Sequence, residues 1–336
     1  MKAIICPEPF SLSVVERPEP VATAGEVVVR IRRVGLCGTD YHIYKGRHPF
    51  LAYPRVMGHE LGGVVEQVGE NSAFQVGQSV VINPYLACGT CIACRNGKPN
   101  ACTEIRVLGV HIDGGMCERL AVPESALVDA TGLTIDQAAM IEFLAIGAHA
   151  VARGNPASGQ RVLVVGAGPI GVSTALFARL NGAAVTLVDT RSARLDHARD
   201  RLGFDDVRLA GPELVDTLQQ STAGEMFDMV FDATGSLAAM AESLRYVAHG
   251  GTLVLVGVAP GDLMFADPEF HKRETTLMAS RNALTADFAR VIAAIRSGDI
   301  NTDVLHTHSL AVDDLPERLP ELIEEADHVL KAIVTL

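Results

Sequence analysis

The sequence predicts an α/β protein with two parts, a β-rich first half and a second half that folds as a doubly wound parallel sheet. The chain has 336 residues, more than one compact hydrophobic core usually accommodates, so two domains are expected. Up to about residue 130, short Val-rich segments are separated by Gly and Pro, a pattern typical of strands joined by turns. From about residue 160, apolar strand segments alternate with helical segments, which indicates a parallel sheet with helical crossovers.

The composition indicates a folded protein that acts on a small molecule. It is 48% hydrophobic and 20% charged, as in soluble globular domains. The formal net charge of −12 disfavours binding to nucleic acid or to an anionic membrane, because these partners are also negative. No apolar run reaches the length of a signal-peptide core or the roughly 18 to 20 residues of a membrane helix. We therefore expect a cytoplasmic protein, in which clustered cysteines bind metal more often than they form disulfides.

The first half is predicted to form a barrel-like fold with long loops. Its main strand segments are 26–35, 62–69, 78–84 and 116–123. Two further segments contain Gly, Pro, His and Cys without regular periodicity and are expected to be loops. These are residues 34–60 and 85–106. Functional residues are often placed on loops of a rigid scaffold, so both loops are candidate sites.

The second half follows a helical segment at 134–154 and a break at 154–159. Six strands are predicted, at 161–166, 183–189, 206–210, 227–235, 250–257 and 275–280. Helical segments such as 169–181 and 191–203 connect them. The chain ends with a helical run at 286–300, another helix and a terminal strand at 331–336. The residue pattern does not assign this tail to either half.

A glycine motif at the start of the second half predicts a dinucleotide site. Gly166, Gly168 and Gly171 have the G-x-G-x-x-G spacing directly after a strand and before a helix, with Pro169 and Ile170 between the last two. The first glycine permits a tight turn, the second lets a pyrophosphate approach the backbone, and the third lets the helix pack on the strand. The helix N-terminus then faces the phosphates. The alternative is a glycine-rich turn that binds another nucleotide or none.

An acidic residue at the end of the next strand favours NAD over NADP. Asp189 follows Gly166 by 23 positions, where a carboxylate accepts hydrogen bonds from the adenosine ribose and repels a 2′-phosphate. Arg191 and Arg194 follow it. They are expected to be solvated helix residues, with Arg194 a candidate cofactor contact, and they leave NADP open as a second possibility.

Four clustered cysteines predict a structural metal. Cys88, Cys91, Cys94 and Cys102 have spacings that let one loop place four thiolates around a tetrahedral ion. A bacterial iron–sulfur motif begins the same way, but its fourth cysteine comes after three residues and precedes Pro, whereas here it comes after seven and precedes Thr103. Zinc is favoured over the iron–sulfur alternative. Since four thiolates fill a zinc ion's coordination, this metal would have no position for a substrate.

A second, more open metal site is expected from residues of mixed type. Cys37 lies 22 and 23 positions before His59 and Glu60. Beside a nicotinamide site, a zinc ion held by such a set would bind an alcohol oxygen and lower the pKa of the hydroxyl, which favours hydride release to the cofactor.

Several phrases together resemble the zinc-dependent medium-chain dehydrogenase/reductase superfamily, in its polyol and threonine dehydrogenase branch. They are CGTDYHIY, YPRVMGHE, GVHIDGG, VLVVGAGPIG, DPEFHKRETT and SRNA, and they are most similar to bacterial sugar-acid oxidoreductases of the L-galactonate 5-dehydrogenase type. The resemblance spans the chain. It implies a GroES-like catalytic domain formed by 1–150 and 287–336, and a Rossmann NAD-binding domain at 151–286. It also implies two zinc ions per subunit, one catalytic and one structural, and a homodimer or homotetramer.

The resemblance also implies ligands for the catalytic zinc. Cys37, His59 and Glu60 would hold the ion, and Glu142 would lie beside it as an alternate ligand or as a partner of its bound water. Family members usually have Pro after this glutamate, whereas this chain has Phe143, which leaves the orientation of Glu142 open.

A proton relay is implied by residues that follow the first ligand. Thr39 would accept the alcohol proton, and His42 would pass it to solvent. Asp40 would orient the imidazole of His59. The alternative without a functional role is that His42 and Asp40 are ordinary loop residues whose side chains form hydrogen bonds with the backbone.

These features predict an NAD-dependent, zinc-dependent dehydrogenase that acts on a secondary alcohol of a polyol or sugar acid. The first alternative keeps the fold and changes the substrate to an amino alcohol such as threonine. An alternative of another class is a zinc-stabilised nucleotide-binding protein without turnover. Candidate contacts for a substrate carboxylate are Arg47, His48, Arg281 and Asn282.

Overall fold

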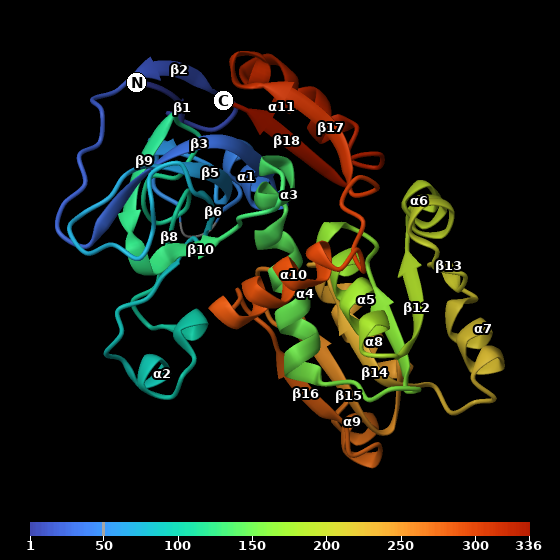
Figure 1. The fold of residues 1–336 in the computed structure, drawn as a ribbon. Helices are drawn as coiled ribbons and strands as arrows, with labels where there is room; N and C mark the ends of the chain where they lie inside the picture. Colours follow the sequence, from blue (N-terminus) through green and yellow to red (C-terminus); the bar gives the residue numbers. More distant parts are fainter. Residues whose placement is uncertain (49–50) are drawn as a thin grey trace. The chain divides into compact units, whose positions relative to one another are not determined.

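The computed structural model describes residues 1–48 and 51–336, which form two compact units (Figure 1). The first unit consists of Met1–Phe143 and Ala283–Leu336, and the second of Leu144–Asn282. The two units are described separately. Within the described residues, no helix combines the length and apolar character needed to cross a membrane.

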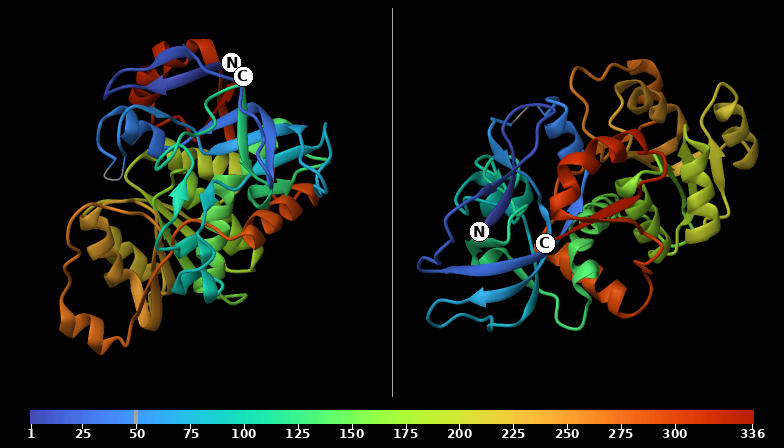
Figure 2. Two further views of the ribbon diagram at one scale, coloured as in Figure 1. Left: turned by 90° about the vertical axis from the view of Figure 1, so that its left-hand side faces the viewer. Right: turned by 90° about the horizontal axis from the view of Figure 1, so that it is seen from above.

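The first unit is built on a seven-stranded sheet that joins the two ends of the chain. Six strands follow the order β10-β6-β5-β3-β18-β17, and β9 also pairs with β3. Their bounds are β3 (Glu26–Leu36), β5 (Glu60–Gln67), β6 (Ser79–Ile82), β9 (Arg119–Pro123), β10 (Leu127–Asp129), β17 (His306–Ala311) and β18 (Lys331–Thr335). β18 pairs antiparallel with β3, and both chain ends lie near one another in every view (Figures 1 and 2). The tail that the residue pattern left unassigned therefore completes the sheet of the first unit.

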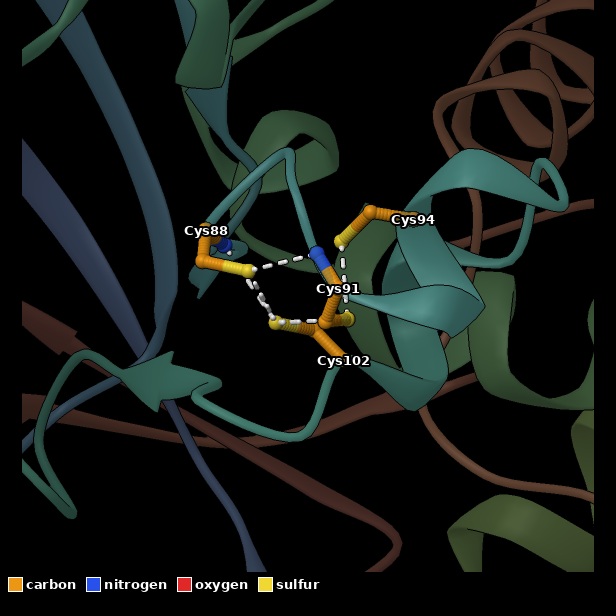
Figure 3. A group of neighbouring side chains, drawn as sticks. All are labelled: Cys88, Cys91, Cys94 and Cys102. Carbon is orange, nitrogen blue, oxygen red and sulfur yellow. Dashed lines mark hydrogen bonds between the residues drawn. The ribbon is translucent and has the colours of Figure 1, made fainter.

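Two small sheets complete the strands of this unit. The order β2-β1-β4 gives a three-stranded sheet of β1 (Lys2–Cys6), β2 (Ser13–Glu16) and β4 (Arg55–Val56). The two-stranded sheet consists of β7 (Tyr85–Leu86) and β8 (Arg106–Val107). This short sheet closes the loop that carries the four clustered cysteines (Figure 3). Strands of two residues have no readable alternation, which is why the sequence predicted only a loop here.

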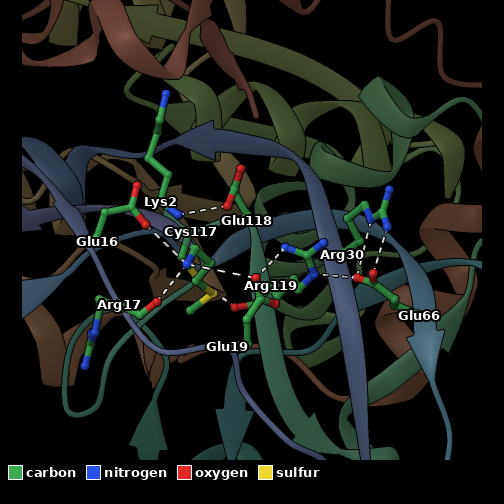
Figure 4. Close-up of polar contacts among 10 residues, drawn as sticks. Lys2, Glu16, Arg17, Glu19, Arg30, Glu66, Cys117, Glu118 and Arg119 are labelled. Atoms are coloured by element: carbon green, nitrogen blue, oxygen red, sulfur yellow. Dashed lines mark hydrogen bonds and ion pairs between the residues drawn. The ribbon is translucent and has the colours of Figure 1, made fainter.

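Charged side chains connect three strands of the seven-stranded sheet. Arg30 on β3 bonds Glu66 on β5 at 2.7 Å, and Arg119 on β9 bonds the other oxygen of Glu66 at 2.9 Å (Figure 4). The hydrogen bond from Arg30 lowers the pKa of Glu66, and the bond from Arg119 adds to the shift. Because this cluster is partly exposed, we expect it to contribute little to stability beyond maintaining strand register.

The helices of the first unit include a break that the sequence did not predict. They are α1 (Gly38–Tyr44), α2 (Ile92–Arg95), α3 (Ile135–Ala139), α10 (Thr285–Arg296) and α11 (Leu315–Glu324), and α4 (Ile141–Gly154) begins here and continues into the second unit. A single helix over 134–154 was expected. Instead, the N–H of Met140 donates to Gln137, three residues back, which tightens the end of α3. A new helix starts at Ile141, so Glu142 lies in its first turn.

Glycines let α3 pack closely on the sheet. A Cβ at Gly62 on β5 would lie 2.7 Å from the carbonyl oxygen of Ile135, and one at Gly35 on β3 would lie 3.0 Å from that of Ala139. The Cβ at Gly35 would also lie 2.1 Å from Oε2 of Glu60. Larger residues at either position would displace the helix or this carboxylate.

The second unit confirms the predicted six-stranded parallel sheet. Its order is β13-β12-β11-β14-β15-β16, and every pair is parallel. The strands are β11 (Arg161–Val165), β12 (Ala184–Asp189), β13 (Val207–Leu209), β14 (Phe227–Asp232), β15 (Val247–Leu255) and β16 (Thr276–Ala279). The helices are α5 (Pro169–Leu180), α6 (Ser192–Leu202), α7 (Leu214–Ser221), α8 (Leu237–Ser243) and α9 (Asp267–Lys272). The strand order reverses between β11 and β14, and ligands of such sheets bind beyond the carboxyl ends of the strands at this reversal.

Candidate functional site

The structure brings the three predicted catalytic zinc ligands together. Cys37 precedes α1 as its N-cap residue, His59 directly precedes β5, and Glu60 is the first residue of β5. One potential ligand atom from each lies within 4.8 Å of the others. His59 and Glu60 are buried, and Cys37 is half-buried. The strands β3 and β5 are paired antiparallel, with Gly35 opposite Glu60, so Leu36 at the end of β3 lies at the same end of the strand pair as Glu60 at the start of β5.

Glu60 also has a buried partner that the sequence analysis missed. The ammonium of Lys331 donates to both oxygens of Glu60, at 2.7 and 2.6 Å, and to the carbonyl of Leu36 at 3.1 Å. Both side chains of the ion pair are fully buried. The ammonium also lies 4.3 Å from the ring centroid of Phe143. Each carboxylate oxygen keeps a further lone pair, so the ion pair is compatible with metal binding by Glu60. The only signal in the sequence was a lysine at the start of an otherwise apolar strand.

Glu142 is held by a tyrosine that the sequence analysis also missed. The hydroxyl of Tyr85 donates to Oε1 of Glu142, while Oε2 is buried without a hydrogen-bond partner. Burial raises the pKa of Glu142 to about 7; the positive charge of His59 opposes this rise, and the negative charge of Glu60 adds to it. The carboxyl group therefore has one oxygen bonded and one without a protein partner. It is near enough to His59 and Glu60 for their charges to shift its pKa, but it is not part of the group of three whose ligand atoms lie within 4.8 Å of one another.

The surroundings of these residues fit a divalent cation. Burial by itself lowers the pKa of His59, but the negative charges of Asp40 and Cys37 outweigh burial and raise it well above its ordinary value. Nδ1 of His59 and Oε2 of Glu142 are buried polar atoms without partners, an arrangement that is costly unless something binds them. One thiolate, one imidazole and carboxylate oxygens are ligand types that zinc accepts. The residues present therefore fit zinc.

The predicted relay residues lie on the helix that starts at the first ligand. The thiol of Cys37 is 3.8 Å from the hydroxyl of Thr39, and His42 is exposed near the end of α1. Asp40 is fully buried, and its carboxylate accepts from the backbone N–H of Cys37 at 3.0 Å and of Gly58 at 3.4 Å. Asp40 therefore connects the two segments that carry ligands. Its predicted role toward the imidazole of His59 stays a prediction.

The four clustered cysteines form a separate group at the tip of their loop. Sulfur–sulfur distances are 3.5 Å for Cys91–Cys94, 3.8 Å for Cys91–Cys102 and 3.5 Å for Cys102–Cys88 (Figure 3). These distances are too long for disulfides. They are close to the edge of about 3.8 Å expected for a tetrahedron with zinc–sulfur distances of about 2.3 Å. An iron–sulfur cluster would place several metal atoms between the sulfurs and separate them further, so the geometry favours a single ion.

Backbone groups around this loop favour charged thiolates. The N–H groups of Thr90 and Cys91 point to the sulfur of Cys88, at 3.4 and 3.3 Å. Backbone hydrogen bonds lower the pKa of Cys88, and lower that of Cys91 to about 5. Burial and the neighbouring thiols raise the pKa of Cys94 to about 12. Thiolates are the form that binds metal, so the backbone favours that form at Cys88 and Cys91, two of the four cysteines.

In the second unit, the glycine motif lies at the carboxyl end of β11. Gly166 has a φ of +98°, a conformation that favours glycine. A Cβ at Gly171 would lie 1.7 Å from the carbonyl oxygen of Gly166, so only glycine lets α5 pack this closely. Gly168 is the N-cap residue of α5, and Pro169 and Ile170 form its first turn. The N-terminus of α5 therefore adjoins the position where the motif would receive phosphates.

Asp189 is buried at the carboxyl end of the neighbouring strand β12. One oxygen accepts from the N–H of Ala167 at 2.6 Å, and the other from that of Arg191 at 2.9 Å. A guanidinium nitrogen of Arg194 is 3.8 Å from Asp189 and would be 3.3 Å from a Cβ at Gly168. Arg194 is thus folded over the glycine loop instead of extending into solvent, which differs from the expectation for a solvated helix residue.

Two family models match most of the chain. The alcohol dehydrogenase GroES-like domain matches residues 23–132, and the zinc-binding dehydrogenase model matches residues 169–297. The L-galactonate-5-dehydrogenase of Escherichia coli strain K12 is 41% identical over 336 residues, which cover 100% of this chain and 99% of that protein.

Solved structures show the same fold over the full length. The structure of an Escherichia coli CFT073 protein, described as a short chain alcohol dehydrogenase (rspB) complexed with the cofactor NADH, has a TM-score of 0.93 and 32% identity. The match covers 100% of this chain and 99% of that chain. The L-idonate 5-dehydrogenase of Escherichia coli K-12 substrain MG1655 has a TM-score of 0.91 and 26% identity, with 100% and 98% of the chains covered.

Proposed function

Because this chain belongs to the family of zinc-binding dehydrogenases with an alcohol dehydrogenase GroES-like domain, we propose that it transfers hydride between NAD and a secondary alcohol of a sugar acid or polyol. The observation that carries the proposal is the group of Cys37, His59 and Glu60, whose ligand atoms lie within 4.8 Å of one another, together with the buried, unpartnered Oε2 of Glu142. The relatives that act on L-galactonate and L-idonate support a hexonate as the substrate class. The family membership predicted from the sequence motifs is confirmed.

The residues of the chain have defined tasks in this proposal. Cys37, His59 and Glu60 would hold a zinc ion, which when bound supplies a Lewis acid that lowers the pKa of the substrate hydroxyl. Thr39 would accept the hydroxyl proton, and the exposed His42 would release it to solvent. In the second unit, the N-terminus of α5 would bind the cofactor pyrophosphate. The cysteine cluster would hold a second zinc ion with a structural task, since four thiolates occupy every position of a tetrahedral ion.

A substrate panel tests the proposal. The purified protein is incubated with NAD or NADP and with hexonates, matched hexitols or threonine, and formation of the reduced cofactor is followed by its absorbance. We expect steady NADH formation with a hexonate. Turnover with threonine alone would replace the substrate class, and no turnover with any of these would leave a zinc-stabilised nucleotide-binding protein.

The choice of NAD is proposed to depend on Asp189. In Asp189→Ala, we expect the ratio of kcat/KM for NAD to that for NADP to fall at least about 10-fold, because a buried carboxylate near the ribose repels a 2′-phosphate. The ratio is the informative quantity, since losing the bond to Ala167 affects both cofactors alike. Asp196→Ala is the control, because this exposed aspartate on α6 bonds only Arg199 among the contacts described. An unchanged ratio in Asp189→Ala would contradict this role.

We propose that the carboxylate of a hexonate accepts hydrogen bonds from histidines near the group of Cys37, His59 and Glu60. Burial lowers the pKa of His48, and the nearby imidazoles of His42, His111 and His59 lower it further. The turn carrying His111 is packed against the residue before His59, since the N–H of Gly115 donates to the carbonyl of Gly58 at 2.9 Å. Nδ1 of His111 accepts from a backbone N–H at 3.1 Å, so its neutral ring donates from Nε2. Of the other candidates, Arg281 and Asn282 belong to the second unit.

His48→Ala is expected to raise KM for a hexonate by about 10-fold to 100-fold, because a hydrogen bond to a charged group contributes about 1.5–3 kcal/mol. KM for a hexitol of the same stereochemistry should stay within about twofold, since it lacks the carboxylate. Steady-state kinetics with both substrates measure this, with His271→Ala on α9 as the control. Equal increases in both KM values would show that His48 does not recognise the carboxylate.

Location and assembly are further parts of the proposal. All seven cysteines are free thiols in the structure, which is consistent with the reducing environment of the cytoplasm. The family resemblance supports a homodimer or homotetramer. Size-exclusion chromatography with light scattering distinguishes these states from a monomer.

A further inference from the structure

We propose that Tyr85 is a positioning residue for the metal site, which holds Oε1 of Glu142 so that Oε2 is presented to the group of Cys37, His59 and Glu60. The inference rests on the proposed zinc site. It assigns to Tyr85 no contact with the substrate and no share in the chemistry.

The burial of Glu142 makes such a partner necessary. The side chain is 1% exposed and lies on an apolar helix, where an unpartnered carboxylate is costly. The hydroxyl of Tyr85 is its described hydrogen-bond donor, and this bond leaves one oxygen without a protein partner. A carboxylate bound at one oxygen has far fewer orientations than one bound at neither, so the second oxygen is directed as well.

The hydroxyl of Tyr85 lies beside the buried carboxylate of Glu142, to which it donates a hydrogen bond. Burial raises the pKa of the Tyr85 hydroxyl well above its ordinary value, and the negative charges of Glu142, Cys37 and Glu60 raise it further. The hydroxyl therefore remains protonated and can donate to the carboxylate.

The backbone on both sides of this hydrogen bond is fixed by other contacts. Tyr85 pairs with Val107 across β7 and β8, at the base of the loop that carries the cysteines, and its N–H donates to Oδ1 of Asn83 at 3.1 Å. Phe143, which follows Glu142, is fully buried with its ring beside the ammonium of Lys331. A rigid donor thus meets a carboxylate on a rigid backbone. The orientation of Glu142, left open by Phe143 in place of Pro, is set by Tyr85.

Tyr85→Phe tests the proposal because it removes one oxygen and keeps the ring. Holoenzyme is equilibrated with increasing concentrations of a zinc chelator, and the zinc retained per subunit is measured. Two zinc ions per subunit should be released in two steps. Cys37→Ala removes one ligand of the group of Cys37, His59 and Glu60, and so shows which step of zinc release belongs to that group. We expect Tyr85→Phe to weaken zinc binding in that step by about 10-fold to 100-fold, as for other residues that orient metal ligands, and to leave the other step unchanged.

Two comparisons separate positioning from a general effect on folding. Tyr53→Phe is the matched control, since its hydroxyl donates to the carbonyl of Ile43 in the same unit, and it should leave zinc affinity unchanged. Glu142→Gln should remove most of the effect of Tyr85→Phe in a double-mutant cycle, because Tyr85 acts through this carboxylate.

Zinc affinity of Tyr85→Phe equal to that of the parent, or additive effects of Tyr85→Phe and Glu142→Gln, would overturn the proposal. Neither measurement uses a substrate. The result is therefore independent of whether the enzyme acts on hexonates.

Discussion

Replacing Lys331 with Met is expected to destabilise the first unit by about 3–5 kcal/mol, because it leaves the fully buried carboxylate of Glu60 without its cation. Met is unbranched and fills most of the volume of the lysine side chain, so the loss of charge dominates over the loss of packing. A change of this size lowers the thermal midpoint of a domain of this length by on the order of 10 °C.

Thermal unfolding of the zinc-free protein, in which no metal ion offsets the charge of Glu60, measures this effect. Lys272→Met is the matched control, because the Lys272 side chain is exposed and its ion pair with Glu269 is long, at 3.4 Å. The thermal midpoint of this control variant should stay within about 2 °C of that of the parent. Adding Glu60→Gln to Lys331→Met should recover part of the loss, since the unpaired charge is then removed as well. A midpoint for Lys331→Met equal to that of the control would show that the ion pair does not stabilise the fold.

Cys37→Ala is expected to reduce kcat/KM for the alcohol by about 10³-fold or more, because the Lewis acid contributes several kcal/mol and this variant removes the thiolate ligand. Cys94→Ser should act differently. It removes one ligand of the cysteine cluster, which would hold a loop whose ends are joined by β7 and β8. We expect this variant to have a lower thermal midpoint and to retain part of its turnover.

Three measurements distinguish the two metal groups: steady-state kinetics, thermal unfolding and NAD affinity by fluorescence titration. Cys37→Ala should bind NAD as the parent does, because the glycine motif and Asp189 belong to the second unit. Cys6→Ala is the control for removing a thiol, since Cys6 is buried and burial raises its pKa to about 11. If Cys94→Ser lost as much turnover as Cys37→Ala at an unchanged midpoint, the assignment of a structural task to the cluster would be wrong.

The sequence was sufficient wherever a signal is local. The six strands of the second unit were predicted because each is a short apolar run between helical segments, and buried parallel strands need apolar residues on both faces. The cysteine cluster and the glycine motif were readable for the same reason, since each site is formed within a few consecutive positions. Cys37, His59 and Glu60 were grouped from residue type and family resemblance, and the structure places them together.

The tertiary structure alone decided the partners of the two buried carboxylates. Lys331 is 271 positions from Glu60 and Tyr85 is 57 positions from Glu142, so neither pair has a periodicity or spacing that a sequence motif could carry. Lys331 reaches Glu60 because β18 pairs with β3, and β3 pairs with β5. The sequence by itself therefore determined which residues are suited to metal and cofactor. The pairing of distant strands decided which charges are neutralised in the core, because burial makes an unpaired charge too costly and only the folded sheet brings its partner within reach.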